Sequence, residues 1–190
     1  MKIYLIRHGE TTSDIEDQYG GAYDDHLTER GQLQAKTLGQ KLVGKGIEAL
    51  YVSPKFRTKE TAQAVIDELA VPMEIMKDLT ERDYGILGGL TKAEALEKHP
   101  EAVENHKNYR NTDPEGESYD DFKTRVMNGF NKIVSSSTYQ TIGILTHGGP
   151  IKMIYRELFK DEIQGSIADC GIMELQYNEG KFIFEGLNKF

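Results

Sequence analysis

Residues 5–14 read LIRHGETTSD, an apolar run that ends in an arginine and a histidine, followed at once by a glycine. Residues 141–150, TIGILTHGGP, repeat the arrangement: an apolar run, a histidine and glycine. Glycine at such a place lets the backbone turn sharply and bring its N–H groups close to a ligand. A lone histidine at a strand end is usually structural, but two His-Gly pairs at equivalent places predict a site at one edge of a sheet.

Strand and helix patterns alternate on either side of these two stretches. The hydrophobic periodicity predicts strands over 2–6, 47–53, 73–79 and 141–146, helices over 28–43, 55–69, 90–99 and 117–135, and a terminal hairpin over 172–187. Such alternation is typical of an α/β fold, here a three-layer sandwich with a central, mostly parallel sheet flanked by helices. Ligands of such folds bind beyond the carboxyl ends of the strands, where both His-Gly pairs lie.

Composition narrows the class of protein. The chain has 190 residues, 38% of them hydrophobic, and no linker or low-complexity tract divides it, so we expect one domain. A net charge of −8 argues against nonspecific binding to nucleic acid or anionic membranes. The single cysteine, Cys170, fits a reducing compartment and is expected to be buried and inert. No apolar stretch is long enough to span a membrane, so we expect a soluble, cytoplasmic protein.

Charged residues at two more strand ends extend the predicted site. Arg57 lies in the first turn of a predicted helix, within SPKFRTKETA, and Glu81 and Arg82 follow the third predicted strand. Arg7 and Arg57 can bind phosphate oxygens in pairs of hydrogen bonds. One histidine can attack phosphorus, the second can stabilise charge, and a carboxylic acid can protonate the departing alkoxide.

Other residues are not expected to take part in this chemistry. No group of residues has metal-ligand spacing, and we expect neither a metal nor another cofactor. His26, His99 and His106 lie in polar surroundings and are expected at the surface. The stretch GQKLVGKG (39–46) is close to a phosphate-binding P-loop, but it has glycine where the magnesium-binding hydroxyl should be and runs through a helix end.

These motifs together resemble the histidine phosphatase superfamily, which has the phosphoglycerate mutase-like fold. The resemblance rests on RHGET (7–11), SPKFRTKETA (53–62), LTERDYG (79–85), His147-Gly148 and the segment GAYDDHLTERGQLQA (21–35). It covers nearly the whole chain in the family's order, and the first motif with its partners is highly specific.

The resemblance implies a role for each matching residue. His8 would become a covalent phosphohistidine, with Arg7, Arg57 and His147 around the phosphoryl group and Glu81 as general acid. Substrate-binding positions would be Asp14, Gly21, Tyr84, Lys92 and Gly148. A small helical cap, inserted over about 82–140 in the single domain 1–190, would cover the site.

Two positions depart from the family. Asp14 stands where the family usually has an asparagine that helps to hold phosphate. An ionised aspartate accepts hydrogen bonds but cannot donate one, so either Asp14 turns away, pairs with a cation or carries a proton, or the site is weakened. His26 stands where the family often has proline, and is a candidate contact at the rim.

The same resemblance leaves a choice between two activities. Tyr84 and Lys92 match a cofactor-dependent phosphoglycerate mutase. Mutases, however, carry a longer insertion with adjacent arginines and favour asparagine where this chain has Gly149. We therefore favour a metal-independent phosphomonoesterase acting on a small phosphorylated metabolite, with the mutase as the alternative. A non-catalytic phosphate-binding protein on the same fold is a third hypothesis, and a homodimer is left open.

Overall fold

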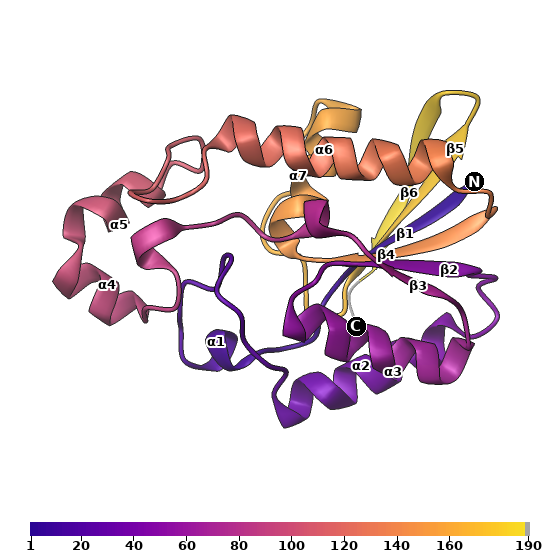
Figure 1. The fold of residues 1–190 in the computed structure, drawn as a ribbon, viewed down its shortest axis with the longest axis horizontal. Helices are drawn as coiled ribbons and strands as arrows, with labels where there is room; N and C mark the ends of the chain where they lie inside the picture. The colour runs from indigo at the N-terminus through magenta and orange to yellow at the C-terminus, as the bar shows by residue number, and fades with distance from the viewer. Residues whose placement is uncertain (189–190) are drawn as a thin grey trace.

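The computed structural model describes residues 1–188 as a sheet between two helical layers (Figure 1). The strands are β1 (Lys2–Arg7), β2 (Ala49–Val52), β3 (Met73–Ile75), β4 (Thr141–Thr146), β5 (Ile172–Asn178) and β6 (Lys181–Asn188). The helices are α1 (Thr12–Ile15), α2 (Glu29–Leu42), α3 (Phe56–Leu69), α4 (Lys92–Lys98), α5 (Pro100–His106), α6 (Tyr119–Ser136) and α7 (Gly148–Phe159). Two short 3₁₀ helices, η1 (Lys77–Leu79) and η2 (Gly85–Leu87), complete the structure.

The sheet is mostly parallel, as predicted. Its strand order is β3-β2-β4-β1-β5-β6, in which β3, β2, β4 and β1 run parallel while β5 and β6 form the predicted antiparallel hairpin. β1 and β4 are neighbours at the centre, with Arg7 opposite Thr146. The two His-Gly pairs therefore leave the sheet side by side.

Each face of the sheet is covered by a pair of helices. Side chains of β1 alternate between the layers: Ile3 and Leu5 join the core under α6 and α7, whereas Tyr4 and Ile6 join the core over α2 and α3. β1 is buried on both faces, as the sequence predicts for a central strand. Cys170 is also buried, and burial raises the pKa of its thiol to about 12.

Three predicted elements differ from the structure. The third strand ends at Ile75, because the chain turns into η1 instead of continuing to residue 79. A second short helix, α5, begins at Pro100, where the sequence analysis predicted no element. α6 lies inside the range predicted for the cap, but it packs on the sheet through the core that includes Phe122 and Phe130. α4, α5 and the loops beside them stand to one side of the sandwich (Figure 1).

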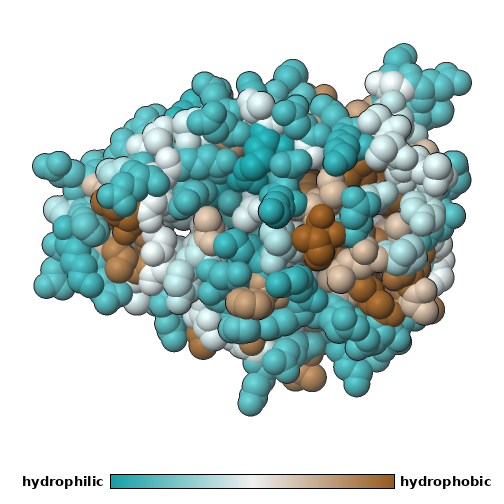
Figure 2. Space-filling view, viewed as in Figure 1, coloured by the Kyte–Doolittle hydropathy of each residue, from teal (hydrophilic) through white to brown (hydrophobic). Residues whose placement is uncertain are grey.

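The surface is mostly hydrophilic on the face shown in Figure 2. The exposed apolar side chains include Met73 and Ile75 on the edge strand β3, each 42% exposed. No helix within residues 1–188 combines the length and apolarity needed to cross a membrane.

The contact between α6 and η1 offers a test of this packing. A Cβ atom at Gly129 would lie 2.5 Å from the Cβ of Asp78, so Gly129→Ala must push the two elements apart. Alanine normally stabilises a helix relative to glycine by about 1 kcal/mol, but overpacking costs about 1–3 kcal/mol. We expect urea denaturation to show a lower free energy of unfolding for Gly129→Ala. Asn128→Ala, at the exposed neighbouring position, should change it by less than about 0.5 kcal/mol. A more stable Gly129→Ala protein would contradict this close contact.

Candidate active site

The loop that carries His8 is held by backbone contacts on three sides. The His8 N–H donates to the Thr146 carbonyl over 3.2 Å, and the Gly9 N–H donates to the Thr61 hydroxyl over 3.1 Å. A Cβ at Gly9 would lie 2.7 Å from the carbonyl oxygen of Gly31, in the first turn of α2. Glycine at position 9 therefore permits the loop to pack directly against the start of that helix.

The imidazole of His8 is oriented as a nucleophile. Its Nδ1 lies 2.8 Å from the Gly9 carbonyl oxygen, which can only accept, so Nδ1 carries the ring proton. The lone pair of Nε2 is then unprotonated. Burial, together with the positive charges of Arg57 and Arg7, holds the pKa of His8 well below its usual range. The ring therefore stays neutral at physiological pH, as attack on phosphorus requires.

His147 packs against His8, but both of its nitrogens are used within the protein. The two rings meet edge to face, with their centroids 5.2 Å apart. Nδ1 accepts from Arg57 Nε over 3.1 Å, so Nε2 carries the proton and donates to the Ser53 hydroxyl over 2.8 Å. Burial and the charge of Arg57 also hold the pKa of His147 well below its usual value. In this arrangement His147 orients Arg57 and supports the ring of His8.

Arg57 is buried and held on almost every side. Nη1 donates to Asp25 and to the Tyr23 carbonyl over 2.6 and 2.7 Å, and Nη2 donates to the Gly21 carbonyl over 2.8 Å. With Nε on His147, four of the five N–H groups are committed and one on Nη2 is left for a ligand. Gly21, predicted to bind substrate, thus has its carbonyl on Arg57, although the residue also lines the cavity described below.

Asp25 is a component of the site that the sequence analysis missed. Its side chain is 2% exposed and forms an ion pair with Arg57. Burial opposes its ionisation, yet Arg57 and the hydroxyls of Ser13 and Thr11 hold the pKa of Asp25 below its usual value. The only signal in the sequence was its place within the GAYDDHLTERG segment.

Arg7 is shared between two carboxylates. Its Nη2 lies 3.3 Å from Asp14 Oδ1 and 3.1 Å from Asp169 Oδ1, while Nη1 donates to the Ile167 carbonyl. Asp14 also accepts two hydrogen bonds from Thr11 at the start of α1, one from its N–H and one from its hydroxyl, both over 2.8 Å. Among the outcomes considered for Asp14, the structure shows pairing with a cation. Asp169 was not predicted; burial raises its pKa against the attraction of Arg7.

The carboxylate of Glu81 contacts the first turn of α7, although Glu81 itself follows η1 in the chain. Its Oε1 accepts the Arg82 N–H and its Oε2 accepts the Gly149 N–H, each over 2.8 Å. A Cβ at position 149 would lie only 2.0 Å from Oε1. Glycine at this position therefore makes room for the Glu81 carboxylate, and each carboxylate oxygen keeps a second lone pair on which a proton can sit.

These groups converge on one cavity of about 260 Å³, which we call the inner cavity. Nine of the ten predicted site residues line it: Arg7, His8, Asp14, Gly21, Arg57, Glu81, Tyr84, Lys92 and Gly148. His147 is the exception, because it does not reach the cavity wall. Burial raises the pKa of Tyr84 and lowers that of Lys92, whose Nζ lies 3.3 Å from the ring centroid of Tyr19.

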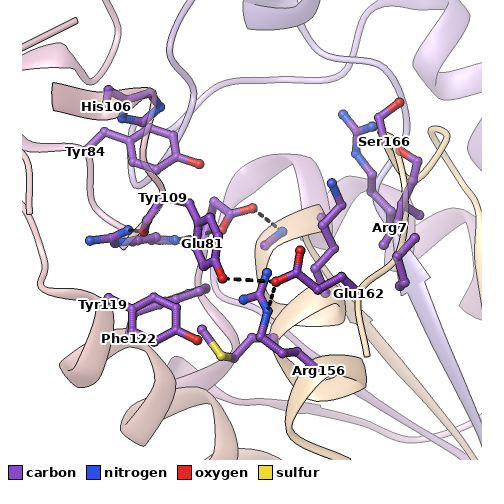
Figure 3. A pocket seen from close by; sticks show the side chains of 17 residues that line it. Arg7, Glu81, Tyr84, His106, Tyr109, Tyr119, Phe122, Arg156, Glu162 and Ser166 are labelled. Atoms are coloured by element: carbon purple, nitrogen blue, oxygen red, sulfur yellow. Dashed lines mark hydrogen bonds and ion pairs between the residues drawn. The ribbon is translucent and has the colours of Figure 1, made fainter. Parts of the chain in front are cut away.

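A second cavity of about 430 Å³, the outer cavity, adjoins the first. The two share five lining residues: Arg7, Glu81, Tyr84, His106 and Gly148. Figure 3 shows Tyr84 and His106 together on one side of the outer cavity, Tyr119 and Phe122 below them, and Arg7 and Ser166 opposite. His106, which was expected at the surface, is half-buried, because the end of α5 turns its ring onto Tyr84. His26 is exposed as expected and pairs with Glu60.

Comparison with known proteins points to one family. A model of the histidine phosphatase superfamily (branch 1) matches residues 3–189. The metal-independent phosphoserine phosphatase of Arabidopsis thaliana is 30% identical over 97% of this chain and 79% of its own. A 2,3-bisphosphoglycerate-dependent phosphoglycerate mutase of Brucella ovis is 32% identical over 82% of this chain and 80% of its own.

Two further similarities concern length and fold. The bifunctional protein Rv2228c of Mycobacterium tuberculosis is 34% identical over 82% of this chain, but the chain spans only 43% of that relative's length. The crystal structure of the alpha-ribazole phosphatase from Shigella flexneri superposes with a TM-score of 0.90 at 24% identity, covering 100% of this chain and 96% of the other. The two chains therefore share one fold.

The buried neutral histidines should make stability depend on pH. The pKa of His8 and of His147 is lower in the folded protein than the unfolded value of about 6.5, so below that pH the unfolded chain binds more protons. Their stabilisation is complete above about pH 6.5 and is lost as the pH falls, by at most about 1.4 kcal/mol per unit for each ring. We expect urea denaturation at pH 7 and at 5.5 to show this decline, with a smaller decline in His8→Gln. The exposed His26→Gln should not reduce it. Equal declines in the wild type and His8→Gln would contradict a buried neutral His8.

Pairing of Arg7 with Asp14 should weaken anion binding. Asp14→Asn keeps an oxygen for Thr11 and removes one of the two negative charges on Arg7, so inorganic phosphate should bind about three- to tenfold more tightly. Isothermal titration calorimetry with inorganic phosphate measures this. Glu16→Gln removes the same charge two residues away, outside the cavity, and is the control. Unchanged affinity in Asp14→Asn would mean that Arg7 and Asp14 do not meet phosphate.

Proposed function

The chain belongs to the histidine phosphatase superfamily (branch 1), and from this premise we propose that it is a metal-independent phosphomonoesterase acting through a phosphohistidine on a small phosphorylated metabolite. The observation that carries the proposal is the state of His8: buried, neutral, and oriented with Nε2 unprotonated in a cavity lined by two arginines. The 30% sequence identity with a metal-independent phosphoserine phosphatase, over 97% of this chain, supports the proposal.

The first step transfers the phosphoryl group to the protein. Nε2 of His8 attacks phosphorus, a N–P bond forms, and the bond to the ester oxygen breaks. Arg7 and the remaining N–H of Arg57 neutralise the oxygens of the transferring group, together with the N-terminus of α7 at Gly148. A proton on Glu81 passes to the departing alkoxide, which leaves as an alcohol.

The second step returns the enzyme to its starting state. Glu81, now a carboxylate, takes a proton from a water molecule that attacks the phosphohistidine, and inorganic phosphate leaves as the N–P bond breaks. The Glu81 carboxylate is held by the N–H groups of Arg82 and Gly149 throughout, so it faces the same reacting centre in both steps. No side-chain group within the described residues has the arrangement of a metal site, and none of these steps calls for one.

The phosphoglycerate mutase is the second candidate, supported by Tyr84 and Lys92 in the inner cavity and by 32% identity with the Brucella ovis enzyme. A mutase must retain a doubly phosphorylated intermediate and exclude water while it reorients. The cavities offer few cations for a second phosphate. Arg82 is committed to the carbonyls of Tyr109, Asn111 and Glu117, and Arg156 is paired with Glu162. This scarcity of free cations favours hydrolysis.

A non-catalytic phosphate-binding protein is the third hypothesis, and it arose from Asp14. The ion pair between Asp14 and Arg7 lowers the attraction for phosphate, but His8, Arg57 and Glu81 still line the inner cavity together. Mere binding of phosphate gives no reason to hold a buried histidine neutral with one nitrogen unprotonated. Catalysis is therefore the stronger interpretation.

One preparation, kept in EDTA, tests all three hypotheses. We expect inorganic phosphate to be released from phosphomonoesters, including p-nitrophenyl phosphate, and 3-phosphoglycerate to show little conversion to 2-phosphoglycerate with 2,3-bisphosphoglycerate present. His8→Ala should reduce release by more than about a thousandfold, whereas His26→Ala should not. Isomerisation faster than release would identify a mutase. No turnover with intact phosphate binding would leave the binding protein, and dependence on added Mg²⁺ would overturn the metal-independent mechanism.

A further inference from the structure

The general acid of the proposed reaction lies in a stretch of chain that belongs to no helix or strand. Glu81 follows η1, which ends at Leu79, and precedes η2, which begins at Gly85. The N–H groups of Arg82 and Gly149 orient the tip of its side chain, but they do not hold the backbone that leads to it. Displacement of a catalytic group by about 1 Å can cost about a hundredfold in rate, so this backbone has to be fixed from elsewhere.

Arg125 on α6 holds the backbone before Glu81. Its Nη1 donates to the carbonyls of Asp78 and Thr80, each over 3.0 Å. Its Nη2 makes a longer contact, of 3.5 Å, with the Glu81 carbonyl. α6 does not need this arginine in order to pack on the sheet, because its apolar side chains lie in the core described above. The guanidinium is thus used on the loop that leads to the general acid.

Glu117, just before α6, binds Arg125 and also the two residues after Glu81. Its carboxylate oxygens accept from Nε and Nη2 of Arg125 over 2.9 and 2.7 Å, which makes a bidentate ion pair. Its N–H donates to the Asp83 carbonyl over 2.9 Å, and its carbonyl accepts from Nε and Nη2 of Arg82 over 3.0 and 2.9 Å. The residues before and after Glu81 are therefore tied to one pair, Arg125 and Glu117.

This pair does not reach the place where a substrate would bind. Neither Arg125 nor Glu117 lines the inner or the outer cavity, but both line a separate surface depression together with Glu81. Their side chains are 25% and 18% exposed, and their charges compensate each other. An effect of the pair on the reaction would therefore come from where it holds Glu81, and not from contact with the ester.

We propose that Arg125 and Glu117 are positioning residues for the general acid: they hold the chain on both sides of Glu81, so that its carboxyl group faces the reacting centre in both steps. The inference rests on the proposed function for the role of Glu81. The contacts that carry it lie outside both cavities and do not depend on that role.

Two esters with different leaving groups test the inference. Phenyl phosphate and p-nitrophenyl phosphate differ by one nitro group, but phenolate is the stronger base and depends more on a proton from Glu81. Arg125→Met keeps the stem of the side chain and removes its donors. It should lower kcat/KM for phenyl phosphate about tenfold and for p-nitrophenyl phosphate less than about threefold. The ratio kcat/KM is suitable because it includes no step after the leaving group departs.

Glu117→Gln is a milder change in the same pair. Glutamine keeps both backbone contacts but replaces one acceptor of Arg125 by an amide nitrogen, so the selective loss should be smaller, about threefold. Glu81→Gln has no acid and sets the full extent of the loss. Two controls should leave the ratio of the two esters unchanged: Glu115→Gln removes an exposed charge from the same depression, and Lys132→Met removes an exposed cation from α6. Equal losses for both esters in Arg125→Met and Glu117→Gln, or no loss, would overturn the inference.

A spectroscopic measurement separates this inference from the proposed function. If the wild type hydrolyses neither ester, the proposed function fails, and NMR still tests what holds Glu81. The Gly149 N–H donates to Glu81 Oε2, so its amide signal reports where that carboxylate lies. In two-dimensional amide spectra this signal should move in Arg125→Met and Glu117→Gln toward its position in Glu81→Ala. It should not move in Glu115→Gln. A Gly149 signal that keeps its wild-type position in both variants of the pair would overturn the inference, whether or not the protein is active.

Discussion

Parallel pairing of β1 with β4 is the constraint on which the site depends. Because Arg7 lies opposite Thr146, the next residue of each strand is a histidine, and the two rings meet at 5.2 Å. Their mutual burial, next to Arg57, is what keeps both imidazoles neutral. A slip of one residue in this register would turn one histidine to the other side of the sheet and remove the contact. The glycine that follows His8 and the one that follows His147 serve the same geometry, since each lets the chain leave its strand without a side chain in the way.

The cations of the site are paired with protein groups before any ligand binds. Arg57 is buried with Asp25, and Arg7 is shared by Asp14 and Asp169. A buried guanidinium requires such partners, because an unpaired charge in this environment is very costly. The same pairing reduces the net attraction for phosphate, in a chain whose net charge is already −8. Under the proposed function, this weaker attraction suits a phosphatase, which must release phosphate in every cycle, better than a mutase, which must keep a doubly phosphorylated intermediate.

The sequence predicted most of what local pattern controls. Apolar runs ending in His-Gly located β1, β4 and the two buried histidines, and the helical pattern over 55–69 placed Arg57 in the first turn of α3. The sequence analysis missed contacts made by loop residues, because loops have no periodicity from which their positions can be predicted. Asp25 reaches Arg57 across 32 residues, and Asp169 reaches Arg7 from beyond α7. The residues next to His106 in the sequence are polar, which indicated an exposed side chain, yet the turn at Asp113 holds its ring over the cavity. The sequence likewise did not show that both ring nitrogens of His147 form hydrogen bonds, because their partners, Ser53 and Arg57, lie elsewhere in the chain.

The layers of the fold divide the tasks of the site. The inner cavity is built from the ends of β1 and β4 and the starts of α3 and α7, whose positions are set by the core on both faces of the sheet. The segment of α4 and α5 contributes Lys92 and His106 but buries only a small cluster of its own, with Leu87, Ala95 and Ala102. We expect substitutions there to cost little in the stability of the sandwich, because its two main cores do not include these residues. Under the proposed function, this division would let the cap select the organic group of the ester while the chemistry at His8 is left unchanged, so that one fold can serve many phosphate esters.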